Sequence, residues 1–194
     1  MKELALHILD IAQNAISAGA AHLTIQLALE EGGVLHVILT DDGRGMDEEL
    51  LARVTDPFTT TRTTRKVGLG LPLLRMAAQQ TGGEVRIFSR LGEGTRVEAD
   101  FDTGHIDCPP LGDLPGVISL LVQGAPQLEL SYLHQTPQGR FQFETGEVRA
   151  VLGPQVPLSA PEVALWIREY VQEGEESLSP TEKKEMLLHK EMKP

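Results

Sequence analysis

Asp41-Asp-Gly-Arg-Gly-Met46 follows Val34–Leu39, a nearly continuous run of apolar residues. An apolar run of this length predicts a strand of the central type. The two glycines of the motif allow backbone conformations that other residues avoid, so a flat group can approach the main chain. The Asp41 carboxylate can accept a hydrogen bond from an exocyclic amino group, the feature that distinguishes adenine from guanine. The stretch predicts a base-binding turn, and in isolation a plain β-turn fits Asp-Asp-Gly equally well.

Residues 2–18 carry apolar side chains at the spacing of a helix with one buried face. Asp10 and Asn14 are four residues apart and therefore share the polar face of that helix. The Asn14 carboxamide can offer its oxygen to Mg²⁺, and the Asp10 carboxylate can accept a proton from water or a hydroxyl. A solvated helix face is the alternative explanation, and the downstream motifs favour the binding site. His7 lies on the same face, where it supports Asp10 or packs.

Residues 56–67 contain five threonines, two arginines and one lysine but few large apolar side chains, which predicts a loop. Arg62, Arg65 and Lys66 bring three cations into an acidic chain, and a guanidinium pairs with phosphate oxygens in a bidentate way. Phe58 is expected to anchor the hinge of this loop. The segment is interpreted as a lid over a nucleotide, with a disordered polar loop as the alternative; both hold if the lid orders only with its ligand.

Gly68-Leu69-Gly70-Leu71 comes immediately before Pro72, a residue favoured in the first turn of a helix. Glycine main chain at a helix N-terminus offers free N–H groups to phosphate. The stretch is not a Walker A loop, because no Gly-Lys-Ser/Thr follows, and it lacks the third glycine and the opening strand of a Rossmann fingerprint. Thr95, which follows Gly92-Glu-Gly94, is expected to place a hydroxyl near the base together with Asp41.

These motifs occur in one fixed order, and in that order they resemble the nucleotide-binding boxes of the GHKL superfamily of ATPases, which joins gyrase, Hsp90, histidine kinases and MutL. The whole chain is similar to small stand-alone bacterial ATP-binding proteins of the histidine-kinase-like type. The resemblance implies ATP and Mg²⁺ as cofactors, with Asn14 as the metal ligand. The residues that it places at the nucleotide are Asn14, Asp41, Gly43, Gly45, Met46, Phe58, Arg62, Arg65, Lys66, Gly68, Leu69, Gly70, Leu71 and Thr95.

The fold class implied by the resemblance is α+β: a two-layer α/β sandwich of the Bergerat type, with helices on one face of a mixed sheet, plus a small C-terminal α/β extension. Expected strands cover 22–30, 34–39, 85–90, 95–101, 128–134 and 141–144, and expected helices cover 2–18, 72–80, 116–123 and 161–172, with a short helix after residue 47. The expected domains are an ATP-binding domain over 1–104, an accessory α/β domain over 105–174 and a charged tail over 175–194.

Composition limits the classes of partner. The formal charge of −11 argues against a surface for nucleic acid. The single cysteine, Cys108, excludes an intramolecular disulfide. Polar residues from His7 to Asn14 interrupt the apolar N-terminal stretch, which excludes a signal peptide, and no segment has the length of a membrane span. The expectation is a cytoplasmic protein without membrane association that acts on a protein partner; a homodimer is left open.

Two hypotheses for the function follow. The first is a Mg-ATP-binding regulator that transfers the γ-phosphate to a separate protein, as anti-sigma kinases of the superfamily do, with Asp10 as the catalytic carboxylate. It has no His-Glu-x-x-x-Pro phosphoacceptor of its own. The second is an ATP-gated switch or slow ATPase that acts as a protein-interaction module, because Asp10 stands where the ATPase branch usually has the longer Glu. A gyrase-like dimer clamp ranks last, since no exchange arm is visible.

Overall fold

The computed structural model of the protein describes residues 3–55 and 70–178. Within these residues the strands are β1 (His22–Leu29), β2 (Val34–Asp41), β3 (Val85–Arg90), β4 (Gly94–Asp102), β5 (Glu129–Thr136) and β6 (Gly139–Glu144). The helices are α1 (Leu4–Ser17), α2 (Glu48–Thr55), α3 (Gly70–Gln80), α4 (Leu114–Gly124), α5 (Thr145–Leu152) and α6 (Pro161–Ser177).

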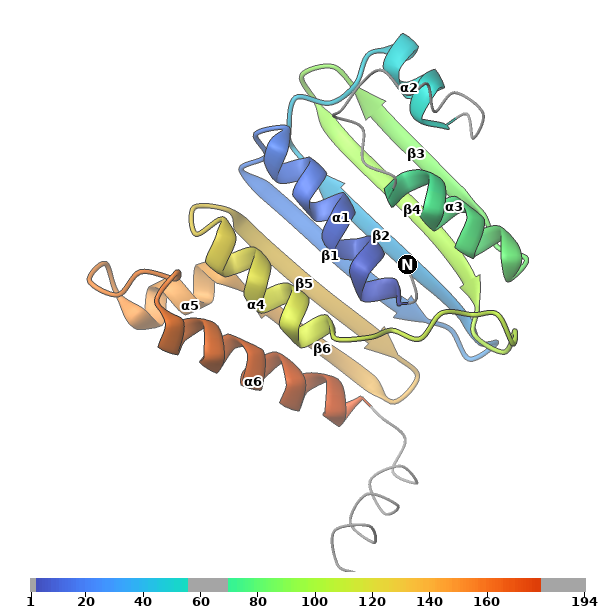
Figure 1. Ribbon diagram of the computed structural model, residues 1–194. Coiled ribbons are helices and arrows are strands. Elements are labelled where there is room, and N and C mark those ends of the chain that lie inside the picture. The colour runs from blue at the N-terminus through green and yellow to red at the C-terminus, as the bar shows by residue number, and fades with distance from the viewer. Residues whose placement is uncertain (1–2, 56–69, 179–194) are drawn as a thin grey trace, which may run out of the picture.

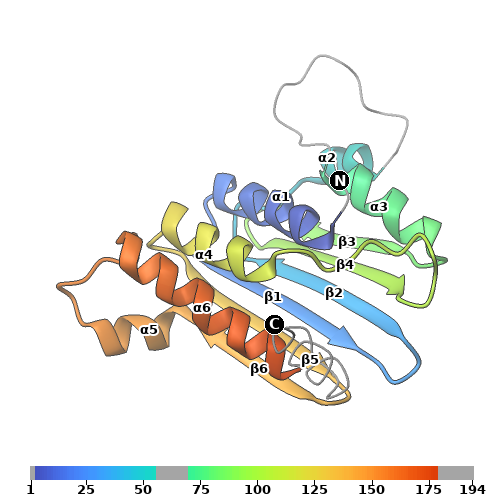
Figure 2. The same cartoon turned by 60° about the horizontal axis from the view of Figure 1, so that its bottom comes forward.

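The strands form one mixed sheet in the order β3-β4-β2-β1-β5-β6 (Figure 1). β1 and β5 are parallel, and every other neighbouring pair is antiparallel. Figure 2 shows α1, α3 and α4 on one face of this sheet. The two-layer α+β fold class is therefore confirmed, and β2 lies inside the sheet between β4 and β1, as the apolar run predicts.

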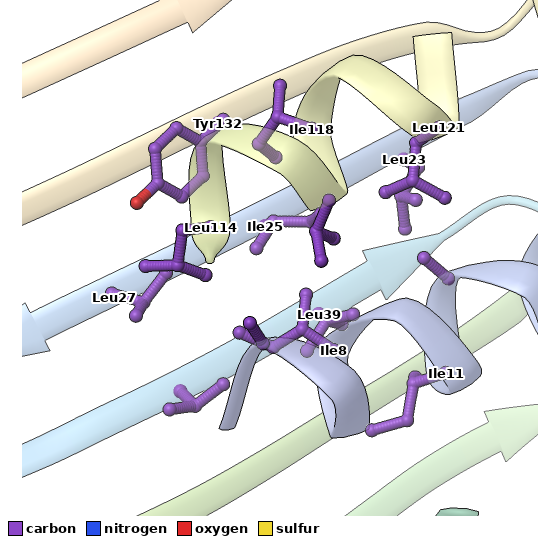
Figure 3. Close-up of a cluster of buried hydrophobic side chains, with 14 of the residues drawn as sticks. Ile8, Ile11, Leu23, Ile25, Leu27, Leu39, Leu114, Ile118, Leu121 and Tyr132 are labelled. Carbon is purple, nitrogen blue, oxygen red and sulfur yellow. The ribbon is translucent and has the colours of Figure 1, made fainter. Parts of the chain in front are cut away.

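The core lies between the helices and one face of the sheet. Alternate residues of β1 point toward α1 and α4, and Leu23, Ile25 and Leu27 are at most 1% exposed. Figure 3 shows these side chains in one cluster with Ile8 and Ile11 of α1 and with residues of α4. The helical spacing of α1 and the alternation of β1 thus bury matching apolar surfaces, which is the largest favourable contribution to a fold of this kind.

The C-terminal part of the chain extends this sheet. β5 pairs with β1 over seven residues, from His22 opposite Glu129 to Ala28 opposite Gln135, and β6 then pairs with β5. Helices α4 and α6 continue the helical layer, and their apolar residues belong to the same buried cluster as those of α1. The division of the chain at residue 104 stays a prediction, but residues 105–178 share the sheet with the preceding part.

Two elements differ from the expectation. α5 was not predicted from the sequence, and α6 continues to Ser177, so the first residues of the expected charged tail belong to a helix. One of them, Glu175, has a side chain that is only 16% exposed. It accepts hydrogen bonds from the Tyr132 hydroxyl at 2.7 Å and from Nδ1 of His134 at 2.8 Å. These bonds fasten the C-terminal half of α6 to β5.

None of the helices in the described ranges combines the length and the apolar character that crossing a bilayer requires.

We expect Glu175→Ala to lower the free energy of unfolding by about 2 kcal/mol, because the Tyr132 hydroxyl and the His134 ring would lose their acceptor inside the protein. Urea unfolding followed by the fluorescence of Trp166 measures this change. Glu176→Ala is the matched control, because its exposed carboxylate bonds only to Gln172 within the described chain, and it should change stability by less than about 0.5 kcal/mol. Equal losses in the two variants would show that the buried bonds do not hold α6.

Candidate functional site

A cavity of about 310 Å³ lies at the end of the sheet where β2 leads into its turn. Helix α1, helix α2 and the start of α3 form one side, and strands β1, β2 and β4 form the other. The residues that line the cavity are Ile11, Asn14, Ala15, Ser17, Ala18, Leu23, Leu39, Asp41, Arg44, Gly45, Met46, Leu50, Val54, Leu71, Thr95 and Val97. Six of the residues expected at the nucleotide are among them: Asn14, Asp41, Gly45, Met46, Leu71 and Thr95.

Asp41 is the last residue of β2 and stands opposite Thr95 of β4 in the strand register. Its Oδ1 accepts a hydrogen bond from the N–H of Gly43 at 2.9 Å. Burial raises the pKa of Asp41, while the N–H groups of Gly43 and Thr95 act in the opposite direction. The site therefore holds a partly desolvated acceptor in a fixed position, the chemistry needed to select a donor group.

Two glycines allow the turn to lie close to the strands behind it. Gly45 has a φ of +64°, and a Cβ there would collide with the carbonyl oxygen of Arg90. Gly94 has a φ of +101°, and a Cβ there would collide with the carbonyl oxygen of Asp41. Both positions combine a left-handed backbone with a close approach, so only glycine fits. The absence of side chains lets the turn pack closely against the β3–β4 hairpin, and Gly45 itself lines the cavity.

Asp42, the neighbour of Asp41, has a structural role instead. Its Oδ1 accepts from the N–H groups of Ala21 and His22, both at 2.8 Å, and its Oδ2 lies 2.6 Å from Nδ1 of His22. The two adjacent carboxylates of the motif therefore do different work. One faces the cavity, and the other holds the turn against the start of β1.

The polar face of α1 approaches the same cavity. Asn14 is exposed and lines it, one turn after Asp10. The Oδ2 atom of Asp10 is buried and has no hydrogen-bond partner among the described residues. A Cβ at Gly70 would collide with that oxygen, so the first residue of α3 lies directly against the Asp10 carboxylate. The Asp10 carboxylate thus lies beside a helix N-terminus, which favours an anion. Asp10 and Gly70 do not themselves line the cavity that Asn14 lines.

His7 lies one turn before Asp10 and is 1% exposed. Within residues 3–55 and 70–178 no hydrogen bond joins either ring nitrogen to another side chain, and the backbone of Gly70 lies near enough to the ring to raise its pKa. Burial lowers the pKa of His7, and the nearby Asp10 carboxylate opposes that shift. The ring is therefore neutral at pH 7, and the structure contains no hydrogen bond by which it supports Asp10.

Six of the predicted residues, Phe58, Arg62, Arg65, Lys66, Gly68 and Leu69, lie outside the described part of the chain. Gly43 does not line the cavity but positions Asp41 through its N–H. The sequence reasoning missed Arg44, the one cation among the described lining residues, although it stands between the two glycines of the motif. It also missed Leu50 and Val54, whose i, i+4 spacing on α2 gives one apolar face to the cavity.

Sequence reasoning also missed Ser89. Its Oγ accepts from the N–H of Met46 at 2.9 Å, donates to the carbonyl oxygen of Gly94 at 2.9 Å and lies 2.8 Å from Oγ1 of Thr95. One hydroxyl on β3 thus joins the turn after β2 to the start of β4. A lone serine in a strand carries no spacing signal, so the sequence offered no means of finding it.

A family model described as histidine kinase-, DNA gyrase B-, and HSP90-like ATPase matches residues 2–105. Histidine protein kinase DivJ of Caulobacter vibrioides is 44% identical over 69 residues, which cover 34% of this chain and 12% of that protein. Sensor histidine kinase ZraS of Escherichia coli is 30% identical over 89 residues, which cover 45% of this chain and 19% of that protein. The chain therefore matches less than a fifth of either relative.

Among solved structures, the histidine kinase domain of the blue-light activated histidine kinase of Erythrobacter litoralis EL346 is 25% identical. The alignment covers 53% of this chain and 44% of that one, with a TM-score of 0.37.

The cavity and the family match together make ATP the ligand to test. We expect Asp41→Asn to weaken ATP binding about 10- to 100-fold, because a buried acceptor for an amino group contributes about 1–3 kcal/mol. The same variant should not lower the thermal stability of the free protein. When folding raises the pKa of a carboxyl, the group stabilises the folded state at a pH below its unfolded pKa. This stability is lost as the pH rises through the folded pKa, so the charged Asp41 carboxylate opposes folding at pH 7.

Calorimetric titration with ATP and thermal unfolding measure these two effects. Only the ionised carboxylate is a full acceptor, and the pKa of Asp41 is raised by burial. As the pH is lowered, the unaltered protein should therefore begin to lose ATP affinity at a higher pH than it would with a carboxyl of ordinary pKa. Asp42→Asn is the control and should leave ATP affinity unchanged, since that side chain bonds to β1. An Asp41→Asn protein with unchanged affinity would contradict this placement of the base.

Proposed function

The chain belongs to the histidine kinase-, DNA gyrase B- and HSP90-like ATPase family, and from this premise we propose that it binds Mg-ATP and transfers the γ-phosphate to a separate protein. The observation that carries the proposal is the Asp10 carboxylate, whose buried Oδ2 has no partner in the described chain and lies against the first residue of α3. A partly buried acceptor without a partner, beside a helix N-terminus, is suited to proton transfer next to a phosphate.

ATP fits the residues that surround the cavity. The base would lie against the Gly45 backbone, with its amino group at Asp41. Leu50, Val54 and Leu71 provide apolar surface for the ring. The phosphates would extend toward Asn14 and the N-terminus of α3. Mg²⁺, held by the Asn14 carboxamide and phosphate oxygens, would neutralise charge on the phosphates.

Asp10 is then the general base. A hydroxyl of the acceptor protein would give its proton to the Asp10 carboxylate as its oxygen forms a bond to the γ-phosphorus. The bond between that phosphorus and the β–γ bridging oxygen breaks, and ADP leaves with the electron pair. The products are a phosphorylated hydroxyl, ADP and a protonated Asp10, which returns its proton to water. A carboxylate suits a hydroxyl acceptor, whereas a nucleophilic histidine needs less help.

The alternative proposal is an ATP-gated switch or slow ATPase that acts as a protein-interaction module. The observation that favours it is an exposed aromatic surface on α6. Trp166 and Tyr170 are 47% and 41% exposed, and their rings stack with centroids 5.2 Å apart. Aromatic side chains exposed together are typical of surfaces that bind another protein. In this proposal ATP would change the affinity for a partner that docks on residues 105–172.

The fate of the γ-phosphate tests the kinase proposal. With γ-labelled Mg-ATP and an extract of the host cell, we expect label on one extract protein, and Asp10→Asn should reduce the rate at least about 100-fold. Asp107→Asn is the control, because its exposed carboxylate lies in the linker before α4, and it should transfer at the unaltered rate.

Other outcomes point elsewhere. Full transfer by Asp10→Asn would exclude the catalytic role of Asp10. Label released as free phosphate by the purified protein would indicate an ATPase. If ATP binds and the label stays on ATP in both experiments, the kinase proposal is wrong and the switch is the better explanation.

A protease test addresses the switch. Arg62, Arg65 and Lys66 are trypsin sites by sequence, and we expect Mg-ATP to slow cleavage there at least about tenfold if it orders this segment. Cleavage at Arg140, on the hairpin between β5 and β6, is the internal control and should not respond. Cleavage after residues 62–66 at the same rate with and without ATP would remove the basis of the switch.

A further inference from the structure

Ser89 lies behind the cavity. It is half-buried on β3 and does not line the cavity, whereas Thr95, with which it shares a hydrogen bond, does. Three polar groups contact the Ser89 oxygen within 2.9 Å: the N–H of Met46, the carbonyl oxygen of Gly94 and the hydroxyl of Thr95. Two of these groups have fixed roles, since a backbone N–H can only donate and a carbonyl oxygen can only accept.

The number of hydrogens on the Ser89 hydroxyl determines which group donates in its contact with Thr95. A serine hydroxyl has one hydrogen and two lone pairs. The contact with the Gly94 carbonyl uses the hydrogen, and the Met46 N–H uses one lone pair. The 2.8 Å contact with Thr95 can then be a hydrogen bond only if the Thr95 hydroxyl donates to the second lone pair. All three contacts are satisfied together in this arrangement alone.

The Thr95 hydroxyl therefore has a fixed direction. Its hydrogen points to Ser89, and its side-chain oxygen has no other hydrogen-bond partner in the described chain. Because Thr95 lines the cavity, this oxygen can accept a hydrogen bond from a ligand there. Asp41, opposite Thr95 in the register, presents a carboxylate, which is also an acceptor. The floor of the cavity thus offers two acceptors side by side and no hydroxyl donor at this point.

We infer that Ser89 is a positioning residue for nucleotide specificity: it holds the Thr95 hydroxyl as an acceptor, so that the site takes 6-amino purines and rejects 6-keto purines. This inference rests on the proposed binding of ATP with its base at Asp41. An exocyclic amino group can donate to such a pair of acceptors. A keto oxygen in the same place would face two acceptors and lose its hydrogen bond to water without replacement.

The test compares ATP with ITP, which carries a keto oxygen in place of the amino group and an N–H in place of the acceptor nitrogen N1. Calorimetric titration of the full chain should give at least about tenfold tighter binding of ATP, the factor expected from one hydrogen bond of ordinary net strength. Ser89→Ala frees the Thr95 hydroxyl to turn and donate to the keto oxygen, so the ATP-to-ITP preference should fall at least about threefold. Ser89→Thr keeps a hydroxyl at the position and should retain the preference.

Two further variants identify the cause. Thr95→Val in the Ser89→Ala background removes the hydroxyl that would turn, so the gain in ITP binding should disappear. Ser131→Ala is the matched control, because Ser131 is a half-buried serine on β5 outside the site, and it should leave the preference unchanged. A Ser89→Ala protein that binds ATP and ITP more weakly by the same factor would show a merely structural role and overturn the inference.

Asp41→Asn separates this inference from the proposed placement of ATP. An Asn side chain can donate to a keto oxygen, so this variant should lower the ATP-to-ITP preference whether or not Ser89 fixes the Thr95 hydroxyl. If Asp41→Asn narrows the preference and Ser89→Ala does not, the base lies where we propose and the role of Ser89 is wrong. If the unaltered protein does not bind ATP, the proposed function itself fails.

Discussion

The antiparallel register of β2 against β4 places Asp41 opposite Thr95, and the rest of the candidate site depends on this pairing. Side chains alternate between the two faces of a strand, so a slip by one residue would turn Asp41 away from the cavity and bring apolar core residues into water. The register is held by the buried residues of the same strands: Leu35, Val37 and Leu39 on β2 stand opposite Phe101, Ala99 and Val97 on β4. The register of β2 against β4 therefore determines both which residues are buried in the core and which face the cavity.

The hydrophobic pattern of the sequence was sufficient for most of the fold. In β1 every second residue from Leu23 to Leu27 is buried, and in α1 the buried apolar residues recur at helical spacing, so both elements and their buried faces could be predicted. α5 could not, because only Thr145 and Val148 of its eight residues are buried, too few to produce a helical period. The parallel pairing of β5 with β1 could not be predicted either, because two strands more than a hundred residues apart carry no local signal of their alignment.

The candidate site likewise contains some residues that could be predicted from the sequence and one that could not. Asp41, Asn14 and Thr95 could be identified because each belongs to a motif in which residue type and spacing suit one chemistry, and the structure brings all three to one cavity. The role of Ser89 depends instead on the positions of its hydrogen-bond partners. Its importance lies in the direction of three hydrogen bonds with groups on two other segments, the turn after β2 and the start of β4. Such a role is visible only after donors and acceptors have been counted in space.

The turn that carries Asp41 is also joined to the C-terminal extension. Asp42 accepts hydrogen bonds from Ala21 and His22, and the carbonyl oxygen of Ala21 accepts in turn from the N–H of Glu129, the first residue of β5. The strands that line the cavity and β5, to which Glu175 of α6 is hydrogen-bonded, are therefore parts of one sheet. Contact alone does not amount to regulation, which requires an element with two arrangements that both sites bias. In the described chain the end of β2 and its turn contact the cavity through Asp41 and the start of β1 through Asp42, and β1 is the strand on which β5 pairs. If ATP regulates a partner, this turn is the element through which the two events have physical contact.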